Sequence, residues 1–279
     1  MPAALAAASP TLDTAAISGA LGRSGQTMDG GVYRVSFPRS DLHVKIGSTT
    51  LLPGFALGGY AAFIGRDQGV LAVGDLVLVE SEIQPVMQAL EQSGFQITAL
   101  HNHLRGESPH VMYMHFMVSG DAGTIAKALR AALALSKTPL GPVAASVPKV
   151  LAFQDAIESG LGRKGKISGS VLSFSIPRME TISMNGTTVP PAAGVATAIN
   201  FEDAGGGNVA TTGDFVLLGS EVPAVENALL ANGIQITALH HHMLEDAPHL
   251  YYMHFWAVGP PSRLATALAQ ALSHANVKT

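Results

Sequence analysis

The sequence predicts an α+β protein built as a tandem duplication of two similar units. The first observation behind this prediction is internal repetition: shifting the chain by 139 positions aligns residues 74–133 with residues 213–272 without a gap, and 29 of the 60 positions are identical. The second is the order of predicted elements in each unit, with several strands followed by a β-α-β-β-α segment. This order is typical of a mostly antiparallel sheet with helices on one face.

The two units are expected over residues 11–137 and 149–279. Between them, the Pro-containing segment 138–148 is the natural linker. Upstream of the strong repeat the match is weaker but visible, because Leu21-Gly22-Arg23 corresponds to Leu161-Gly162-Arg163.

The elements of unit one can be justified in order. Residues 32–37 and 42–46 alternate enough to be strands, and residues 58–64 and 70–79 are apolar runs flanked by Gly and Asp. Residues 83–93 have apolar side chains at helical spacing, with Ser81 as the expected cap and Gly94 after the end. Residues 95–103 and 111–118 are predicted strands joined by a polar loop, and Asp121 is expected to cap a last helix over 122–135. Unit two repeats this order from about Ile157.

Composition excludes several classes of function. Hydrophobic residues make up 47% of the chain and charged residues 13%, so a large core can form. The net charge of −4 and the lack of a basic run make nucleic acid an unexpected partner. There are no cysteines, which excludes thiolate metal sites, disulfides and cysteine nucleophiles. No apolar run is long enough for a transmembrane helix.

Histidine is the informative residue, and eight of the eleven histidines recur at matched positions in the two units. The recurring set also contains one glutamate per unit. Its members are Glu82, His101, His103, His110 and His115 in unit one, and Glu221, His240, His242, His249 and His254 in unit two.

Strand geometry predicts that three of these histidines converge in each unit. Residues two apart share a face of a strand, so His101 and His103 lie on the same side as Phe95, Ile97 and Ala99. A hairpin would bring His115 opposite or diagonal to Ala99, at a Cβ distance of about 5–8 Å. His101, His103 and His115, and equally His240, His242 and His254, are therefore the predicted metal ligands.

The remaining members of the set have more open roles. Glu82 and Glu221 are predicted to approach the imidazoles as a fourth ligand or as acid–base groups, although an acidic residue in a first helical turn also interacts well with the helix dipole. His110 and His249 are expected at the same rim as ligands, outer partners or proton shuttles. Tyr113 and Tyr252 are expected on the ligand face, where they would orient a substrate.

Packing is the competing interpretation. One His-x-His pattern alone is weak, but matched sets in both halves are harder to explain by packing, because histidine fills a core poorly. For Met112, Met114 and Met117 a core role is the simpler reading, with a methionine-lined copper site as the alternative.

The motif Thr98-Ala99-Leu100-His101-Asn102-His103, with Gly74-Asp75-Leu76-Val77-Leu78 before it and Met114-His115-Phe116 after it, resembles the LppY/LpqO-like family of secreted or lipid-anchored bacterial proteins. The resemblance covers both halves of the chain. It implies an exported location and no particular reaction. Because a lipobox cysteine is absent, a lipid anchor is not expected.

The N-terminal residues 1–10 are small and uncharged, like the end of a signal peptide whose earlier part has been removed, so a secreted or periplasmic location is expected.

The predicted function is a metal-dependent enzyme with hydrolytic or lyase chemistry on a small-molecule substrate. Its metal is most simply Zn, with Fe, Mn, Ni or Cu as alternatives. Two other functions stay open: a secreted protein that binds and sequesters metal, and an Fe or Cu oxidoreductase. The oligomeric state is not predicted.

Overall fold

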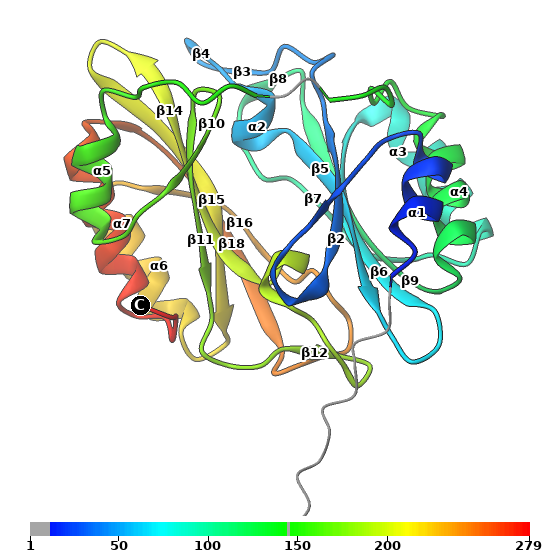
Figure 1. Cartoon of the computed structure of the whole chain (residues 1–279). Helices are drawn as coiled ribbons and strands as arrows, with labels where there is room; N and C mark the ends of the chain where they lie inside the picture. Colours follow the sequence, from blue (N-terminus) through cyan, green and yellow to red (C-terminus); the bar gives the residue numbers. More distant parts are fainter. Residues whose placement is uncertain (1–11, 144–145) are drawn as a thin grey trace, which may run out of the picture.

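Two six-stranded antiparallel sheets dominate the computed structural model, which describes residues 12–143 and 146–279 (Figure 1). The strand order is β1-β2-β5-β6-β9-β7 in one sheet and β10-β11-β14-β15-β18-β16 in the other. The two orders match strand for strand, which confirms the α+β class and the duplication.

The strands of the first sheet are β1 (Gln26–Thr27), β2 (Tyr33–Pro38), β5 (Gly58–Gly65), β6 (Val70–Val79), β7 (Gln96–His101) and β9 (Val111–Gly120). Those of the second are β10 (Lys166–Ser168), β11 (Val171–Pro177), β14 (Ala196–Gly205), β15 (Asn208–Leu218), β16 (Gln235–His240) and β18 (Leu250–Gly259). Each half adds a small three-stranded sheet. These comprise β3 (Lys45–Ile46), β4 (Thr49–Thr50) and β8 (Glu107–Ser108), and then β12 (Ser183–Met184), β13 (Thr187–Thr188) and β17 (Asp246–Ala247).

Helices cover the outer face of each large sheet. The first half has α1 (Thr14–Leu21), α3 (Glu80–Gln92) and α4 (Ala122–Leu133), and the second has α5 (Gln154–Leu161), α6 (Val222–Ala231) and α7 (Pro261–Leu272). Short helical turns are α2 (Pro53–Ala56), η1 (Asp29–Gly31) and η2 (Pro191–Ala193). In Figure 1 the two helical layers lie on opposite sides of the molecule, so the inner faces of the sheets are turned toward each other.

The apolar residues follow this layering. One core lies between each sheet and its own helices, as Leu76, Met114 and Leu129 show in the first half. Two further cores contain residues of both halves: one joins Tyr60 and Met117 to Met184 and Met243, and the other packs Phe55 and Tyr113 with Trp256. The halves therefore share a buried interface between their sheets.

Several predicted boundaries are corrected by the structure. The predicted strand over residues 42–46 is only Lys45–Ile46, and α1 was not predicted, although Asp13 caps it by accepting from the Ala16 amide. Ser81 lies inside α3 and does not cap it. Asp121 does cap α4, through the Thr124 amide, as predicted.

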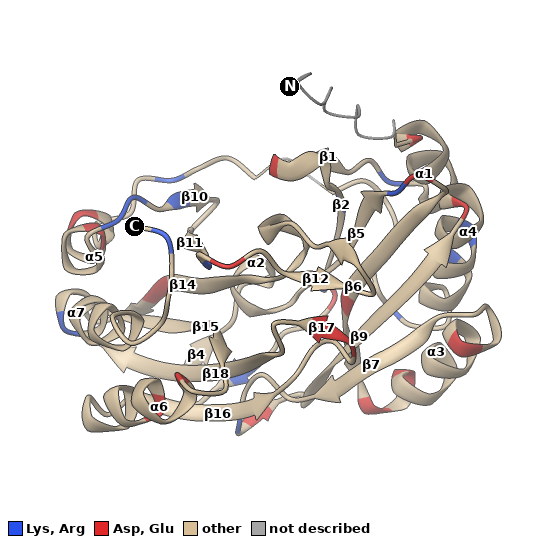
Figure 2. Cartoon of the chain, turned by 90° about the horizontal axis from the view of Figure 1, so that it is seen from below, with Lys and Arg blue, Asp and Glu red and all other residues tan. Residues whose placement is uncertain are grey.

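In Figure 2 the lysines and arginines are scattered over the helices and connecting segments and do not form one stripe. Across residues 12–143 and 146–279, no helix has the length and apolar character needed to cross a membrane. The predicted signal-peptide remnant at residues 1–10 lies outside the described residues.

Candidate metal centre

Six histidines meet between the two sheets in what we call the imidazole cluster. It consists of His101, His103, His115, His240, His242 and His254. His101 and His240 end β7 and β16, His103 and His242 follow these strands, and His115 and His254 lie within β9 and β18. The register places His115 directly opposite Ala99, as predicted.

The closest pairs of imidazole rings join the two halves. Ring centroids are 3.5 Å apart for His101–His240, 3.5 Å for His103–His254 and 3.7 Å for His115–His242. Within unit one, by contrast, His101 lies 5.2 Å from His103 and 5.0 Å from His115. Each predicted set of three histidines converges, and the two sets lie together in one shared cluster.

A β-bulge in each half turns the histidines toward this interface. The pairing of β7 with β9 shifts between Ile97 and Ala99, leaving Thr98 as the extra residue, and the same shift occurs at Thr237. Phe95 and Ile97 consequently pack on the helix side of the sheet. The prediction that they share a face with His101 is wrong, because a bulge reverses the alternation of side chains.

The cluster presents unpaired ring nitrogens. In all six histidines Nε2 is buried and has no hydrogen-bond partner among the described residues. Nδ1 of His101, His240 and His254 lies 3.1–3.2 Å from a backbone carbonyl, to which it donates when Nε2 is the unprotonated nitrogen. Such a hydrogen bond orients the ring and leaves the Nε2 lone pair free for a metal ion.

Three overlapping sets of ligand atoms lie close enough to hold an ion. The sets are His101, His240, His242 and His254; His101, His103 and His115; and His103, Asp214 and His254; within each set all ligand atoms lie within 4.8 Å of one another. The first set contains the three histidines predicted for unit two, and the second consists of the three predicted for unit one.

Burial favours the neutral form of four of these imidazoles. It lowers the pKa of His103, His115 and His242 well below the ordinary value, and the neighbouring imidazoles lower it further. Burial lowers the pKa of His240 to about 3. Neutral imidazole is the form that coordinates a metal.

Two aspartates beside the cluster were not identified from the sequence. Asp75 is paired with His115 across β6 and β9, and Asp214 with His254 across β15 and β18. Oδ1 of Asp75 lies 3.7 Å from His115 Nε2, and Asp214 contacts Nδ1 of His254. Their recurrence as Gly-Asp at positions 74–75 and 213–214 was the available signal.

The charge on Asp75 depends on what the cluster holds. Burial raises the pKa of Asp75 well above its ordinary value, and the nearby Asp214 raises it further. A cation beside the imidazoles would favour the ionised form of Asp75.

Tyr113 and Tyr252 lie at the cluster, as predicted. Their rings lie on His103 at 3.7 Å and on His242 at 3.5 Å. The Tyr113 hydroxyl donates to the Ala56 carbonyl at 2.6 Å, whereas the buried Tyr252 hydroxyl has no partner among the described residues.

Glu82 and Glu221 are not part of the cluster, which corrects their prediction as ligands or acid–base groups. Glu82 accepts from Arg39 at 2.7 and 3.2 Å and from the backbone amides of Val79 and Lys137. Glu221 accepts in the same way from Arg178. Both oxygens of each carboxylate are engaged, and among the described contacts none is to a histidine.

His110 and His249 are also not brought to the cluster. Their side chains are 55% and 47% exposed, and they pair with Glu107 at 2.5 Å and with Asp246 at 2.7 Å. The predicted metal-ligand role of these two histidines is therefore corrected. Each directly precedes a long strand, and its side chain points to solvent and away from the cluster.

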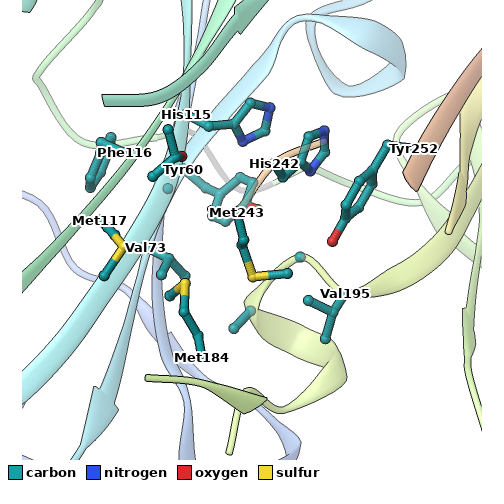
Figure 3. Close-up of a pocket in the computed structure, with 14 residues that line it drawn as sticks. Tyr60, Val73, His115, Phe116, Met117, Met184, Val195, His242, Met243 and Tyr252 are labelled. Carbon is teal, nitrogen blue, oxygen red and sulfur yellow. The ribbon is translucent and has the colours of Figure 1, made fainter. Parts of the chain in front are cut away.

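One flank of the cluster opens into a cavity of about 20 Å³ (Figure 3). His115, His242 and Tyr252 line it from the cluster side. On the other side lie the methionines Met117, Met184 and Met243. This volume holds about one water molecule and is far smaller than a typical pocket for an organic ligand, of about 300–1,000 Å³.

Fold and site together define a duplicated α+β protein with an imidazole cluster at the junction of its halves. The chain belongs to the family described as Domain of Unknown Function (DUF1259), whose model matches residues 15–135 and again residues 155–274. Comparison with curated proteins finds no match.

Two solved structures show a weak likeness. One is a trimeric bacterial microcompartment shell protein, PduB, with 9% identity, a TM-score of 0.23 and coverage of 90% of this chain and 89% of that one. The other is EtuB from Clostridium kluyveri, with 9% identity, a TM-score of 0.21 and coverage of 95% and 93%. At these TM-scores the likeness carries no argument about function or assembly.

Proposed function

We propose that this protein binds a transition-metal cation in the imidazole cluster and serves to hold or deliver it. The observation that carries the proposal is that six histidines of one cluster have a buried Nε2 without a hydrogen-bond partner in the described structure, and that ligand atoms of His101, His240, His242 and His254 lie within 4.8 Å of one another. Leaving a buried polar atom unpaired costs about 1–3 kcal/mol. A coordinated cation would use these lone pairs and remove that cost.

The ligand chemistry favours a borderline cation. Imidazole nitrogen suits Zn, Cu, Fe and Ni, whereas Mn is better served by carboxylate and water. Zn remains the first choice, and His101, His240, His242 and His254 are the residues that would hold it. Asp75 and Asp214 would balance the added positive charge.

The small cavity supports binding over hydrolysis or lyase chemistry. A space of about 20 Å³ accommodates no organic substrate beside the cluster. A metal-dependent enzyme acting on a very small molecule is the second candidate. The Tyr252 hydroxyl on the cavity wall, which has no partner in residues 12–143 and 146–279, favours it, because that group can donate a hydrogen bond to a ligand there. An exported location, secreted or periplasmic, is proposed from the LppY/LpqO-like resemblance alone.

The test is a Zn(II) titration of metal-free protein against a competing chelator. His101→Ala is expected to weaken binding by more than about 100-fold, because removing a ligand should exceed the 10–100-fold effect of losing an outer partner. His110→Ala is the matched control and should leave the affinity within about twofold, since His110 is exposed and paired with Glu107.

Circular dichroism would check that both variants fold, and His101→Gln provides a second variant that keeps a polar side chain. The proposal fails if the wild type binds no Zn(II), Cu(II), Ni(II) or Fe(II) at micromolar concentration. It also fails if both folded His101 variants bind as tightly as the wild type.

A further inference from the structure

The duplication gives each half of the chain its own set of three histidines. The first-half triad consists of His101, His103 and His115, whose ligand atoms lie within 4.8 Å of one another. The second-half triad consists of His240, His242 and His254, whose ligand atoms meet the same limit. No histidine is common to the two triads, so each triad has a full set of three ligands for an ion of its own.

The ring separations within a triad fit the binding of one ion. Two imidazoles that bind one tetrahedral ion through nitrogen at about 2.0–2.1 Å have ring centroids about 5 Å apart. In the first-half triad, the ring of His101 lies 5.2 Å from that of His103 and 5.0 Å from that of His115. In the second-half triad, the ring of His240 lies 4.9 and 4.6 Å from the other two. Each triad is therefore spaced like the ligands of a single ion.

The two triads face each other through stacked rings, and each stacked pair has one ring from each triad. The ring centroids lie 3.5–3.7 Å apart in the three pairs, which are His101–His240, His103–His254 and His115–His242. Figure 3 shows the last of these pairs beside the cavity. The ions of two-metal sites lie about 3.5–4 Å apart, which is close to the separation of these rings. Two ions, one in each triad, would use all three pairs without two stacked rings binding the same ion.

A single ion leaves part of the imidazole cluster unused. The set of His101 with the second-half triad engages four of the six histidines. The buried Nε2 atoms of His103 and His115 then keep no partner among the described residues, which is unusual for buried polar atoms. A second ion in the first-half triad would engage both of them, together with His101.

Each triad also has an aspartate beside it. Oδ1 of Asp75 lies 3.7 Å from Nε2 of His115 in the first-half triad, and Asp214 contacts Nδ1 of His254 in the second-half triad. The ligand atom of Asp214 also lies within 4.8 Å of that of His103, so this carboxylate is near both triads. Two neighbouring cations repel each other, and a carboxylate close to both offsets part of that repulsion.

We propose that the imidazole cluster is a two-metal centre, in which the first-half triad holds one ion and the second-half triad holds the other. This proposal deepens the metal-binding function above and rests on it. It differs from that function in the number of ions and in assigning His101 to the first-half triad once both ions are bound.

The test counts the ions bound to each chain. Metal-free protein is dialysed against Zn(II) buffered at micromolar concentration, and the zinc per chain is measured by elemental analysis. We expect about two equivalents in the wild type, as in other two-metal sites. The double variant His103→Gln, His115→Gln should keep about one, because His101 and the second-half triad still form a four-histidine set.

Two further variants complete the comparison. His242→Gln, His254→Gln should also keep about one equivalent, because the first-half triad remains. His110→Gln, His249→Gln is the matched control and should keep the wild-type count, since both side chains are about half exposed and paired with carboxylates. Circular dichroism would check that every variant folds.

Electron paramagnetic resonance of Cu(II)-loaded protein gives a second readout. Two Cu(II) ions in one cluster couple magnetically, so the fully loaded wild type should give a spin-coupled spectrum. The His103→Gln, His115→Gln variant should give the spectrum of an isolated ion.

The outcomes separate this proposal from the function on which it rests. One zinc equivalent in the wild type would overturn the two-metal centre and leave the metal-binding function standing, whereas no bound metal would overturn both. An uncoupled spectrum of the fully loaded wild type would also overturn the two-metal centre. So would a zinc count other than about one in the folded His103→Gln, His115→Gln variant.

Discussion

A buried ion pair between Glu82 of α3 and Arg39 links this helix to the first sheet. Arg39 is fully buried, and it also donates to the Val77 carbonyl and to Asp41. Arg178 and Glu221 repeat the arrangement, with Arg178 donating to the Val216 carbonyl. These glutamates recur because each half needs the same structural link, which accounts for their repetition without a metal.

Replacing Glu82 should therefore reduce stability and leave metal binding alone. Removing one partner of a buried ion pair costs about 3–5 kcal/mol, because the other charge stays buried. We expect Glu82→Gln to lower the free energy of unfolding by this amount in urea denaturation, and to leave Zn(II) affinity of the folded protein unchanged. Glu91→Gln, at an exposed position of the same helix, should change neither quantity. Weaker Zn(II) binding by folded Glu82→Gln would restore the ligand hypothesis.

The central strands β6 and β15 carry a glycine immediately before each cluster aspartate. A Cβ at Gly74 would collide with the Tyr60 carbonyl and the Phe116 ring, and one at Gly213 with the Ala198 carbonyl. The neighbouring strand can therefore approach closely at this point. These glycines hold the strands in the register that pairs Asp75 with His115 and Asp214 with His254.

Two glycine substitutions should have opposite effects. Gly74→Ala is expected to lower the free energy of unfolding by about 1–3 kcal/mol through overpacking. Gly19 lies inside α1 with no atom near the position of a Cβ, so Gly19→Ala should raise stability by about 0.5–1 kcal/mol. Thermal and urea unfolding would measure both. Equal stability of the two variants would contradict the close approach at Gly74.

The two halves are joined by polar contacts as well as by the shared cores. The Leu52 amide donates to Glu202 at 3.0 Å, and Asn200 donates to the Phe55 carbonyl. Arg34 donates to the Ala192 carbonyl. Near the cluster, the Asn102 side chain donates to the Thr237 carbonyl. These contacts position one half against the other and so complete the imidazole cluster.

Glu202 should make stability depend on pH. Burial raises its pKa from 4.5 to about 8, so between these values the carboxyl is protonated in the folded protein and ionised after unfolding. Unfolding then releases a proton, and stability falls as pH rises through this window and levels off above it. Glu202→Gln should flatten this dependence and be relatively most stabilising near pH 9. Parallel pH profiles of the wild type and the variant would contradict this assignment.

Local patterns in the sequence were sufficient to predict the duplication, most strands and helices, and the grouping of His101, His103 and His115. These features depend on short-range rules, since strand alternation and hairpin pairing involve residues near in the chain. The same rules could also have predicted that Asp75 lies beside His115, because β6 pairs directly with β9.

Only the tertiary structure decided that the two sets of histidines form one cluster. The contact of His101 with His240 joins residues 139 positions apart, and it depends on how the inner sheet faces pack, which no local pattern encodes. The bulges at Thr98 and Thr237 reversed the predicted face of Phe95 and Ile97. Strand order alone predicted that Glu82 would lie near the histidines. In the structure Glu82 instead pairs with Arg39, because a buried guanidinium requires a carboxylate partner, and this pairing joins residues far apart in the sequence.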